Sequence, residues 1–493
     1  MSKAHEHQLS HPDIDPARQR ILLVILSAIF MTLLSISIVN VALPSIQSSL
    51  QTTFADLQWI LSGYALSFGV FLVGAGRAGD LFGRGALFIF GAILFTVASI
   101  AAGFAPDPLW LNVARVFQGI GSGFLNPQGV GMIQQYFHGK ERGRAFGLFG
   151  TAVGLSVAIG PVLGGLMIKV FGPELGWRLT FLINVPAGIL TIVLAWLWFP
   201  RPLLLLDKFK KPGWFSSLDP VGASLLGLAV LAILFPFVES YRSALLWLLI
   251  PLGLFLIWLF VRWERYYEKK GLSPMVNLGV FSIPSFRNGS IVMSLFFLGM
   301  SSVWVLVPIY LQQGLGFSAF AAGSIGIPAA LLSSWASNRA GNAVGTYGIR
   351  VVIFGITLTL LGVLLCILTI YLNTHYGVSI WWLAIGLSLF GMGQGITISP
   401  NQTLTLSEVP LNYAGSSGAV VQTGQRIGTS IGIAVITALV FTLQPLYSWM
   451  TAMVAGYLGV FIIISLSLLL SLKDWKRIRH TVEAVEQIPP SSL

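Results

Sequence analysis

The sequence predicts an all-α polytopic membrane protein with fourteen transmembrane helices. Of its 493 residues, 55% are hydrophobic and only 9% are charged, and the mean hydropathy is +0.83. A soluble domain, in contrast, has about a quarter of its residues charged. Apolar runs of about 20 residues, the length that crosses a bilayer as a helix, recur along the chain. The pattern lacks the alternating strands of membrane barrels, so helices are the remaining way to satisfy every backbone group in lipid.

The predicted spans fall into groups of six, two and six. They cover residues 21–43, 57–76, 86–104, 109–131, 145–168, 179–199, 217–238, 244–261, 288–311, 318–337, 351–372, 380–400, 416–441 and 449–472. Prolines and clustered basic residues at 200–216 and 262–287 mark the borders of a two-helix insert between two six-helix halves. The predicted parts are a disordered cytoplasmic tail 1–20, a first half 21–199, the insert with its flanks 200–287, a second half 288–472 and a cytoplasmic tail 473–493.

The distribution of basic residues predicts the orientation. With both termini placed in the cytoplasm, the inner segments hold 23 Lys and Arg and the outer segments hold three, as the positive-inside rule requires. The net charge of +11 is therefore a topology signal and a contact with anionic membrane lipids, and we expect no nucleic-acid partner. The polar N-terminal segment lacks the apolar core of a cleaved signal peptide. We expect a multi-pass protein of the plasma membrane.

The predicted spans contain few groups that could do chemistry. Away from the span ends they hold no Asp, Glu or His, and the only cysteine, Cys366, lies inside an apolar run. A membrane enzyme would need clustered nucleophiles, bases or metal ligands, and a phosphate site would need a Gly-Lys-Ser/Thr loop. We therefore expect no enzyme, no metal and no cofactor.

The short inner loop after the second span carries the strongest local motif. Gly76 and Gly83 allow a tight turn and close approach of helices. Asp80 lies near the start of the third span, where the helix dipole favours a carboxylate, and Arg84 follows one turn later. We predict a conformational latch on the inner face in which Asp80 pairs with Arg84 or Arg144; a solvated turn is the alternative.

Two arginines and a glycine-rich helix are further candidates. Arg115 and Arg426 lie at membrane depth, where a charged residue normally faces the bundle interior. The alternatives are that Arg115 reaches the surface by snorkelling and that Arg426 braces two helices. In the fifth span, Gly160 and Gly164 permit close packing, and Pro161 removes a backbone donor and bends the helix. Plain packing of small residues is the alternative there.

Together these motifs resemble the major facilitator superfamily, and within it the second, fourteen-span family of drug:proton antiporters. The resemblance covers about residues 20–472. The matching segments are Ile38–Pro44, the loop residues Gly76, Asp80, Gly83 and Arg84, and the segments Arg115–Gly121, Gly160–Gly165 and Gly176–Pro186. The resemblance implies a major facilitator fold, drug export by alternating access, a coupling or substrate path that includes Arg115 and Gln118, and a helix-bending antiporter motif that includes Gly165.

One position departs from the family pattern. The antiporters commonly carry an acid five residues before the Asn of their VNVALP run, and this chain has Ser35 there. Serine does not titrate near neutral pH and arginine stays protonated, so proton coupling rests on the resemblance. An edge carboxylate such as Asp56 or Glu239 could take up the proton instead, and a facilitator is the alternative.

The missing acids also bear on the substrates. Cationic drugs are best held by a buried carboxylate, because an unpaired charge in an apolar pocket is costly. We therefore expect lipophilic neutral or anionic small molecules, with Trp59, Tyr64 and Trp304 as candidate contacts; packing or interface anchoring is the alternative role for each. We expect a monomeric multidrug exporter. Export of an endogenous metabolite or lipid-like molecule, and a receptor-like descendant without transport, are the alternatives.

Overall fold

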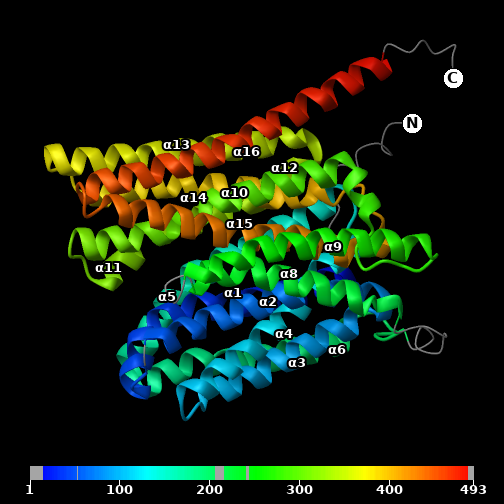
Figure 1. The fold of residues 1–493 in the computed structure, drawn as a ribbon, viewed down its shortest axis with the longest axis horizontal. Helices are drawn as coiled ribbons and strands as arrows, with labels where there is room; N and C mark the ends of the chain where they lie inside the picture. Colours follow the sequence, from blue (N-terminus) through cyan, green and yellow to red (C-terminus); the bar gives the residue numbers. More distant parts are fainter. Residues whose placement is uncertain (1–14, 53, 206–215, 240–243, 487–493) are drawn as a thin grey trace, which may run out of the picture.

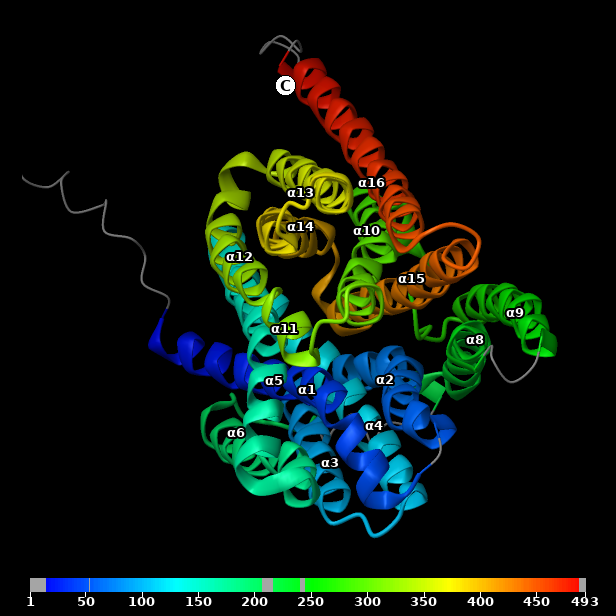
Figure 2. The ribbon, with the colours of Figure 1, turned by 90° about the vertical axis from the view of Figure 1, so that its left-hand side faces the viewer.

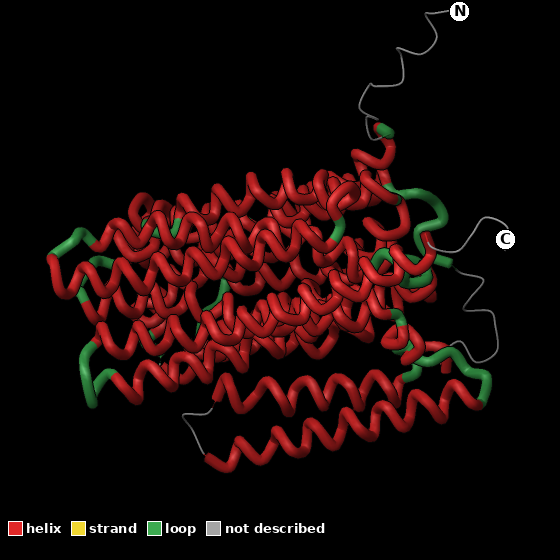
Figure 3. The backbone as a smooth tube through the Cα atoms, turned by 90° about the horizontal axis from the view of Figure 1, so that it is seen from above, coloured by secondary structure: helices red, strands yellow, loops and turns green. Residues whose placement is uncertain are grey.

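The computed structural model describes residues 15–52, 54–205, 216–239 and 244–486. Within this part of the chain every regular element is helical, and long helices run side by side along one axis (Figures 1 and 3). The start of α1 and the end of α16 lie at the same end of the bundle, on the right in Figure 1. We call this end the termini end.

The first half of the chain forms one helical group. It contains α1 (Pro16–Leu50), α2 (Phe54–Phe82), α3 (Arg84–Gly103), α4 (Pro108–Tyr136), α5 (Gly139–Leu182) and α6 (Asn184–Trp198). Its large apolar core includes Tyr64, Phe88 and Phe146 and extends to residues of the second half, among them Phe286 and Val421.

The insert forms a separate pair of helices. They are α8 (Pro220–Glu239) and α9 (Leu249–Lys269), preceded by the short helices η1 (Ser216–Leu218) and η2 (Ala244–Leu248). The pair lies beside the bundle (Figure 2). Leu66 of α2 packs there against Val230 and Leu234 of α8.

The second half forms the other helical group (Figure 2). It contains η3 (Leu278–Ser282), α10 (Pro284–Ile309), the π-turn η4 (Tyr310–Gly314), α11 (Ala319–Ser324), α12 (Ile327–Tyr347), α13 (Ile349–Tyr376), η5 (Ile380–Trp382), α14 (Leu383–Thr405), η6 (Leu411–Tyr413), α15 (Ala414–Leu443) and α16 (Trp449–Glu486). Its own core includes Phe296, Tyr457 and Cys366. This second core consists of residues of the second half alone, whereas the first core also contains residues of the insert and of the second half, so the two groups of helices pack against each other in this state.

The number of membrane crossings stays a prediction. In the described ranges, eleven helical segments are long and apolar enough to cross a membrane, and one of them, Gly139–Trp198, covers two predicted spans. The predicted spans 109–131 and 318–337 fall on α4 and on α11 with α12, which are outside that group. Span 318–337 is also interrupted, because Ile325 and Gly326 separate α11 from α12.

Two predicted boundaries differ from the structure. Residues 16–20 were expected in a disordered tail but are helical, because Asp15 caps α1 by accepting a hydrogen bond from the amide of Ala17 at 3.2 Å. Arg18 then pairs with Glu141 of α5 at 2.9 Å. At the other end α16 continues beyond residue 472 to Glu486. The rest of the predicted tails, 1–14 and 487–493, lies outside the described residues.

A bend in α5 accounts for the predicted outer segment between spans five and six. Gly172 has φ 79° and ψ 166°, a conformation that suits glycine, and Pro173 follows it. The chain is helical on both sides of this bend and turns into α6 at Asn184. The predicted loop is therefore a kink between two helical segments.

Candidate functional site

The predicted latch forms a buried ion pair. The side chain of Asp80, near the end of α2, is fully buried, and Nη2 of Arg84 donates to its Oδ1 at 2.7 Å. Nε of Arg84 lies 3.2 Å from the same oxygen. Of the two partners that the sequence offered, Asp80 therefore pairs with Arg84 in this structure rather than with Arg144.

Asp80 also binds the other half of the molecule. The amides of Gly415 and Ser416, at the start of α15, donate to Oδ1 and Oδ2 of Asp80, each at 2.9 Å. The first amides of a helix have no partner within it, and the helix dipole favours a negative charge there. Asp80 thus ties the end of α2 to the start of α15. We call Asp80, Arg84, Gly415 and Ser416 the latch.

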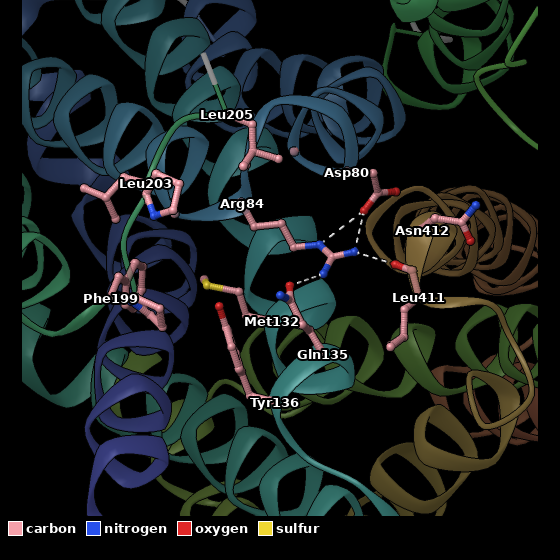
Figure 4. Close-up of a pocket in the computed structure, with 15 residues that line it drawn as sticks. Asp80, Arg84, Met132, Gln135, Tyr136, Phe199, Leu203, Leu205, Leu411 and Asn412 are labelled. Carbon is pink, nitrogen blue, oxygen red and sulfur yellow. Dashed lines mark hydrogen bonds and ion pairs between the residues drawn. The ribbon is translucent and has the colours of Figure 1, made fainter. Parts of the chain in front are cut away.

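Arg84 adds further contacts across the same boundary (Figure 4). It donates to the side-chain oxygen of Gln135 in α4 and, through Nη2, to the carbonyl of Leu411 at 2.8 Å. The cavity beside it has a volume of about 330 Å³, with Tyr136 and Phe199 in its wall. One arginine therefore joins α3, α4 and the turn before α15.

Close backbone contacts require both glycines of the predicted inner loop, of which Gly76 lies within α2. A Cβ atom on Gly76 would lie 2.7 Å from the carbonyl oxygen of Gly415. Gly83 has φ 111°, and a Cβ there would lie 2.4 Å from the carbonyl oxygen of Leu203. Gly76 thus lets the halves meet, and Gly83 makes the turn between α2 and α3.

Other contacts hold the halves together at the termini end. Nε2 of Gln134 donates to the carbonyl of Leu406 at 2.8 Å. The hydroxyl of Ser337 donates to the carbonyl of Gly147 at 3.1 Å, and that of Thr151 to the carbonyl of Ser334 at 2.8 Å. The described structure is therefore closed at this end.

Arg115 is the centre of a second, buried site. Only 1% of Arg115 is exposed, so it does not snorkel. Its Nε donates to the carbonyl of Ile60 at 2.8 Å, and its Nη1 donates to Oε1 of Gln118 at 2.8 Å and to the hydroxyl of Ser35 at 3.3 Å. Gln118 donates in turn to the hydroxyl of Ser99 at 2.7 Å. All of these partners are neutral.

Aromatic rings complete the surroundings of the two arginines. The guanidinium of Arg115 lies 4.4 Å from the ring centre of Tyr64, and that of Arg426 lies 4.6 Å from the ring centre of Phe68. The Tyr64 hydroxyl bonds to that of Ser122 at 2.5 Å. The structure thus brings Ser35, Tyr64, Arg115 and Gln118 together, with Arg426 on the other half facing the same aromatic pair.

Two candidate substrate contacts lie apart from this centre. The ring of Trp59 packs against Phe235 of the insert, with ring centres 6.1 Å apart. Trp304 packs edge-on to Phe390 at 5.9 Å, and its Nε1 donates to Gln394 within the second half at 3.3 Å. These contacts place both tryptophans in helix packing.

The glycine motif of α5 allows close packing against one neighbouring helix, α1. A Cβ on Gly160 would lie 1.9 Å from the hydroxyl oxygen of Ser37 in α1, and one on Gly164 would lie 3.0 Å from the carbonyl oxygen of Ile38. Pro161 lies inside the helix. A Cβ on Gly165, in contrast, would have nothing within 4 Å, so Gly165 contributes nothing to this packing.

The fold and these sites define a two-body helical membrane transporter, and comparison with known proteins agrees. The sequence profile of the Major Facilitator Superfamily matches residues 25–212 and 210–433. This chain belongs to the major facilitator superfamily. Its fold resembles that of the human organic anion transporter MFSD10, with a TM-score of 0.66, 14% identity and coverage of 93% of this chain and 100% of the other.

Curated relatives cover most of the chain. A probable actinorhodin transporter of Streptomyces coelicolor is 34% identical over 425 residues, which is 85% of this chain and 72% of that protein. The multidrug resistance protein Stp of Mycobacterium tuberculosis is 27% identical over 439 residues, 87% of this chain and 76% of that protein. The puromycin resistance protein of Streptomyces alboniger is 29% identical over 431 residues, 86% and 82% of the two chains.

Sequence reasoning missed the partner of Asp80 across the halves. The signal is the run of small residues at 414–418, at the start of the predicted span 416–441. Small residues at a helix start leave its amides accessible to a carboxylate from another segment. The pairing itself joins positions more than 300 residues apart, so the local sequence pattern does not contain it.

Proposed function

We propose that this chain exports amphiphilic small molecules by alternating access. The observation that carries the proposal is the latch, in which one charged side chain of the first half caps a helix of the second half at a closed end. Such a contact can break and re-form as two bodies rock. The names of the relatives, which refer to antibiotic transport and drug resistance, support export as the direction.

In this proposal the protein crosses the plasma membrane fourteen times, with the termini end in the cytoplasm. The basic residues support this orientation, because the predicted inner segments carry most of them. The latch then closes the path on the cytoplasmic side. The described state is the one that would release substrate outward.

The proposed substrates are lipophilic neutral or anionic molecules. Arg115 and Arg426 bring positive charge next to the rings of Tyr64 and Phe68, and the hydrogen-bond partners of Arg115 are neutral. A dicationic drug would be repelled by this arrangement, whereas an aromatic anion could bind the arginines and stack on the rings.

Proton coupling requires a proton-binding group outside the first span. Ser35 stands in the first span where an acid would be expected, and it accepts a hydrogen bond from Arg115. We propose proton-coupled export in which the proton binds elsewhere in the chain. A facilitator is the alternative, and the neutral partners of Arg115 favour it.

Transport in inside-out vesicles with a pH-sensitive dye tests both parts. We expect uptake of a neutral or anionic drug together with proton movement, and little uptake of a dicationic dye. Equal uptake of the dication would contradict the charge argument. Substrate movement without proton movement would show that the protein is a facilitator. If no compound moved, the receptor-like protein without transport would be the remaining function.

Ser35→Asp is the informative variant in the same assay. Because the Ser35 hydroxyl lies 3.3 Å from Nη1 of Arg115, an aspartate there would form an ion pair with it. In this variant the ion pair should keep Arg115 from binding an anionic substrate. We expect anion transport to fall at least about tenfold, which corresponds to about 1.4 kcal/mol. Ser35→Asn, an uncharged side chain of the same size at the same position, is the control for the added volume.

A further inference from the structure

A pair of buried carboxyl groups lies at the termini end of the insert. Asp219 directly precedes α8, and Glu264 lies near the end of α9. Both are among the least exposed acids in the described structure, at 0% and 1%. A carboxyl group is seldom this buried without a partner, so the pair needs an explanation.

Asp219 is stabilised as the carboxylate. Its Oδ1 accepts hydrogen bonds from the amide of Gly222 at 2.9 Å and from Nε1 of Trp263 at 2.7 Å. It also stands at the start of α8, where the helix dipole favours a negative charge. Its second oxygen, Oδ2, is buried without a hydrogen-bond partner.

Glu264 has the opposite surroundings. Both of its carboxyl oxygens are buried, and no hydrogen bond of good geometry reaches either of them, although the backbone of Met275 and Val276 and the side chain of Asp219 lie close to the carboxyl group. A Cβ on Gly222 would lie 2.3 Å from Oδ2 of Asp219 and 2.9 Å from Oε1 of Glu264. The unpartnered oxygens therefore border the same small space, which glycine leaves open.

One proton on the pair would join two of these three oxygens in a hydrogen bond. Two carboxylates in a shared buried site repel each other, so the pair holds a proton. A neutral Glu264 has an O–H that can donate to Oδ2 of Asp219. A proton on Asp219 instead would weaken its two existing hydrogen bonds. The proton therefore belongs on Glu264.

Arg77 connects the pair with the latch. Arg77 is 3% exposed, precedes Asp80 in α2 and donates to the carbonyls of Ser217 at 3.5 Å and Ser273 at 3.3 Å, which flank the insert. Its guanidinium lies 5.7 Å from the ring centre of Tyr413, in the turn before α15.

The titratable groups around the pair lie on α2, in η6 and on α9 itself. Arg77 and Asp80 belong to α2, Tyr413 belongs to η6, and Tyr267 is buried one turn after Glu264 on α9. With one proton on the pair, Arg77 and Asp219 balance each other. Without it, the buried cluster carries an excess negative charge.

We propose that Asp219 and Glu264 form a proton-binding site on the insert. When this site loses its proton, the added negative charge attracts Arg77 away from its position beside Asp80, and the latch weakens. The role of this site in export rests on the proposed transport function. The step is simple: the O–H bond of Glu264 breaks, and the proton leaves to the solvent at the termini end. Because the closed arrangement accommodates the protonated pair, raising the pH favours opening. This site would supply the titrating acid that the first span lacks.

Infrared difference spectroscopy of the purified protein in lipid nanodiscs tests the proton site directly. We expect a protonated-carboxyl band that disappears as the pH rises and that is absent in Glu264→Gln. Glu268→Gln, an exposed acid one turn away on the same helix, is the matched control and should retain the band. A spectrum without such a titrating band, or a band that survives in Glu264→Gln, would overturn the proposal.

A distance measured between the two halves tests the link between the proton site and the latch. Spin labels at Lys140→Cys and Tyr347→Cys, in a Cys366→Ala background, report on the termini end from exposed positions in the two halves. We expect the distance to lengthen with pH in the otherwise native chain and to stay short at every pH in Glu264→Gln, which mimics the protonated acid. A pH-dependent distance that persists in Glu264→Gln would overturn the link.

These readouts separate the two proposals. If no compound is transported but the carboxyl band and the distance respond to pH as described, the proton site stands and the export function fails. If Glu264→Gln does not fold, Gly222→Ala serves instead, because its methyl group would enter the space between the two carboxyl groups. That variant should change the pH at which the band disappears, and an unchanged titration would count against the site.

Discussion

At the scale of single residues, one side chain, that of Asp80, binds three other residues. Its Oδ1 accepts hydrogen bonds from Arg84 and Gly415, and its Oδ2 accepts one from Ser416. The ion pair fixes the turn between α2 and α3, while the two amide contacts fix that turn to α15. The closed state therefore depends on the charge of this residue and not merely on its shape.

Asp80→Asn tests that dependence. The Asn side chain has one acceptor oxygen in place of two. It carries no negative charge to attract Arg84 or the first amides of α15. Hydrogen bonds to charged groups contribute about 1.5–3 kcal/mol each, so we expect the closed fraction and the transport rate to fall at least about tenfold. Drug efflux from cells with matched surface expression measures it.

Asp107→Asn is the control for that variant. Asp107 also caps a helix, by accepting a hydrogen bond from the amide of Trp110 at 2.8 Å, but both residues belong to the first half. Asn caps a helix about as well as Asp, so Asp107→Asn should leave both the helix and the transport rate close to native. Full transport by Asp80→Asn, or equal losses in the two variants, would contradict the latch.

At the scale of elements, α5 packs closely against a helix of each half. Gly160 and Gly164 face α1, whereas Gly150 and Gly154 face Ser337 and Ser334 of α12. Glycines let the helix approach both neighbours closely, and Pro161 directly follows Gly160. The same helix can thus slide against either body with little side-chain interlocking.

Gly160→Ala tests the close packing of α5 on α1. The new methyl group would lie 1.9 Å from the Ser37 hydroxyl oxygen and 2.8 Å from its Cβ, so the helices must separate. Overpacking of this kind costs about 1–3 kcal/mol, and we expect a lower Tm in a thermal-shift assay of the purified protein. Gly165→Ala, whose methyl would meet nothing within 4 Å, should leave Tm unchanged; equal shifts would refute the assignment.

At the scale of the whole molecule, closure at the termini end must be reversible for transport to occur. Contacts between the halves at that end come from the latch and from α5 against α12. Most of them are single hydrogen bonds to backbone carbonyls or amides, each with a modest net contribution of about 1 kcal/mol. Such an interface can open without unfolding either core.

A reversible cross-link tests this requirement. In a Cys366→Ala background, Gly150→Cys and Ser337→Cys would place two thiols on α5 and α12, where a Cβ on Gly150 lies 3.1 Å from the Cβ of Ser337. That spacing is near the range of about 3.5–4.5 Å found in disulfides. We expect oxidation to stop transport in vesicles and a reductant to restore it. Each single-cysteine variant should transport under both conditions; undiminished transport by the oxidised pair would show that this end need not open.

The sequence by itself determined the helical class of the protein, its family and much of its local chemistry. Apolar runs of bilayer length admit few structures other than helices, so the predicted spans fall on helices of the described structure. The contact between Asp80 and Arg84 was also predictable, because residues one turn apart meet on neighbouring turns of chain. Motifs of this kind depend on spacing along the chain alone.

The tertiary structure alone decided which distant groups meet. The start of α15 binds Asp80, Ser35 and Ile60 share Arg115, and Asp219 and Glu264 border one buried space. None of these pairings follows from periodicity, because helix packing and not sequence distance sets them. For the same reason Trp59, an aromatic candidate by type, lies against the insert. Residue type indicates what a side chain can do, and packing determines the partner with which it does it.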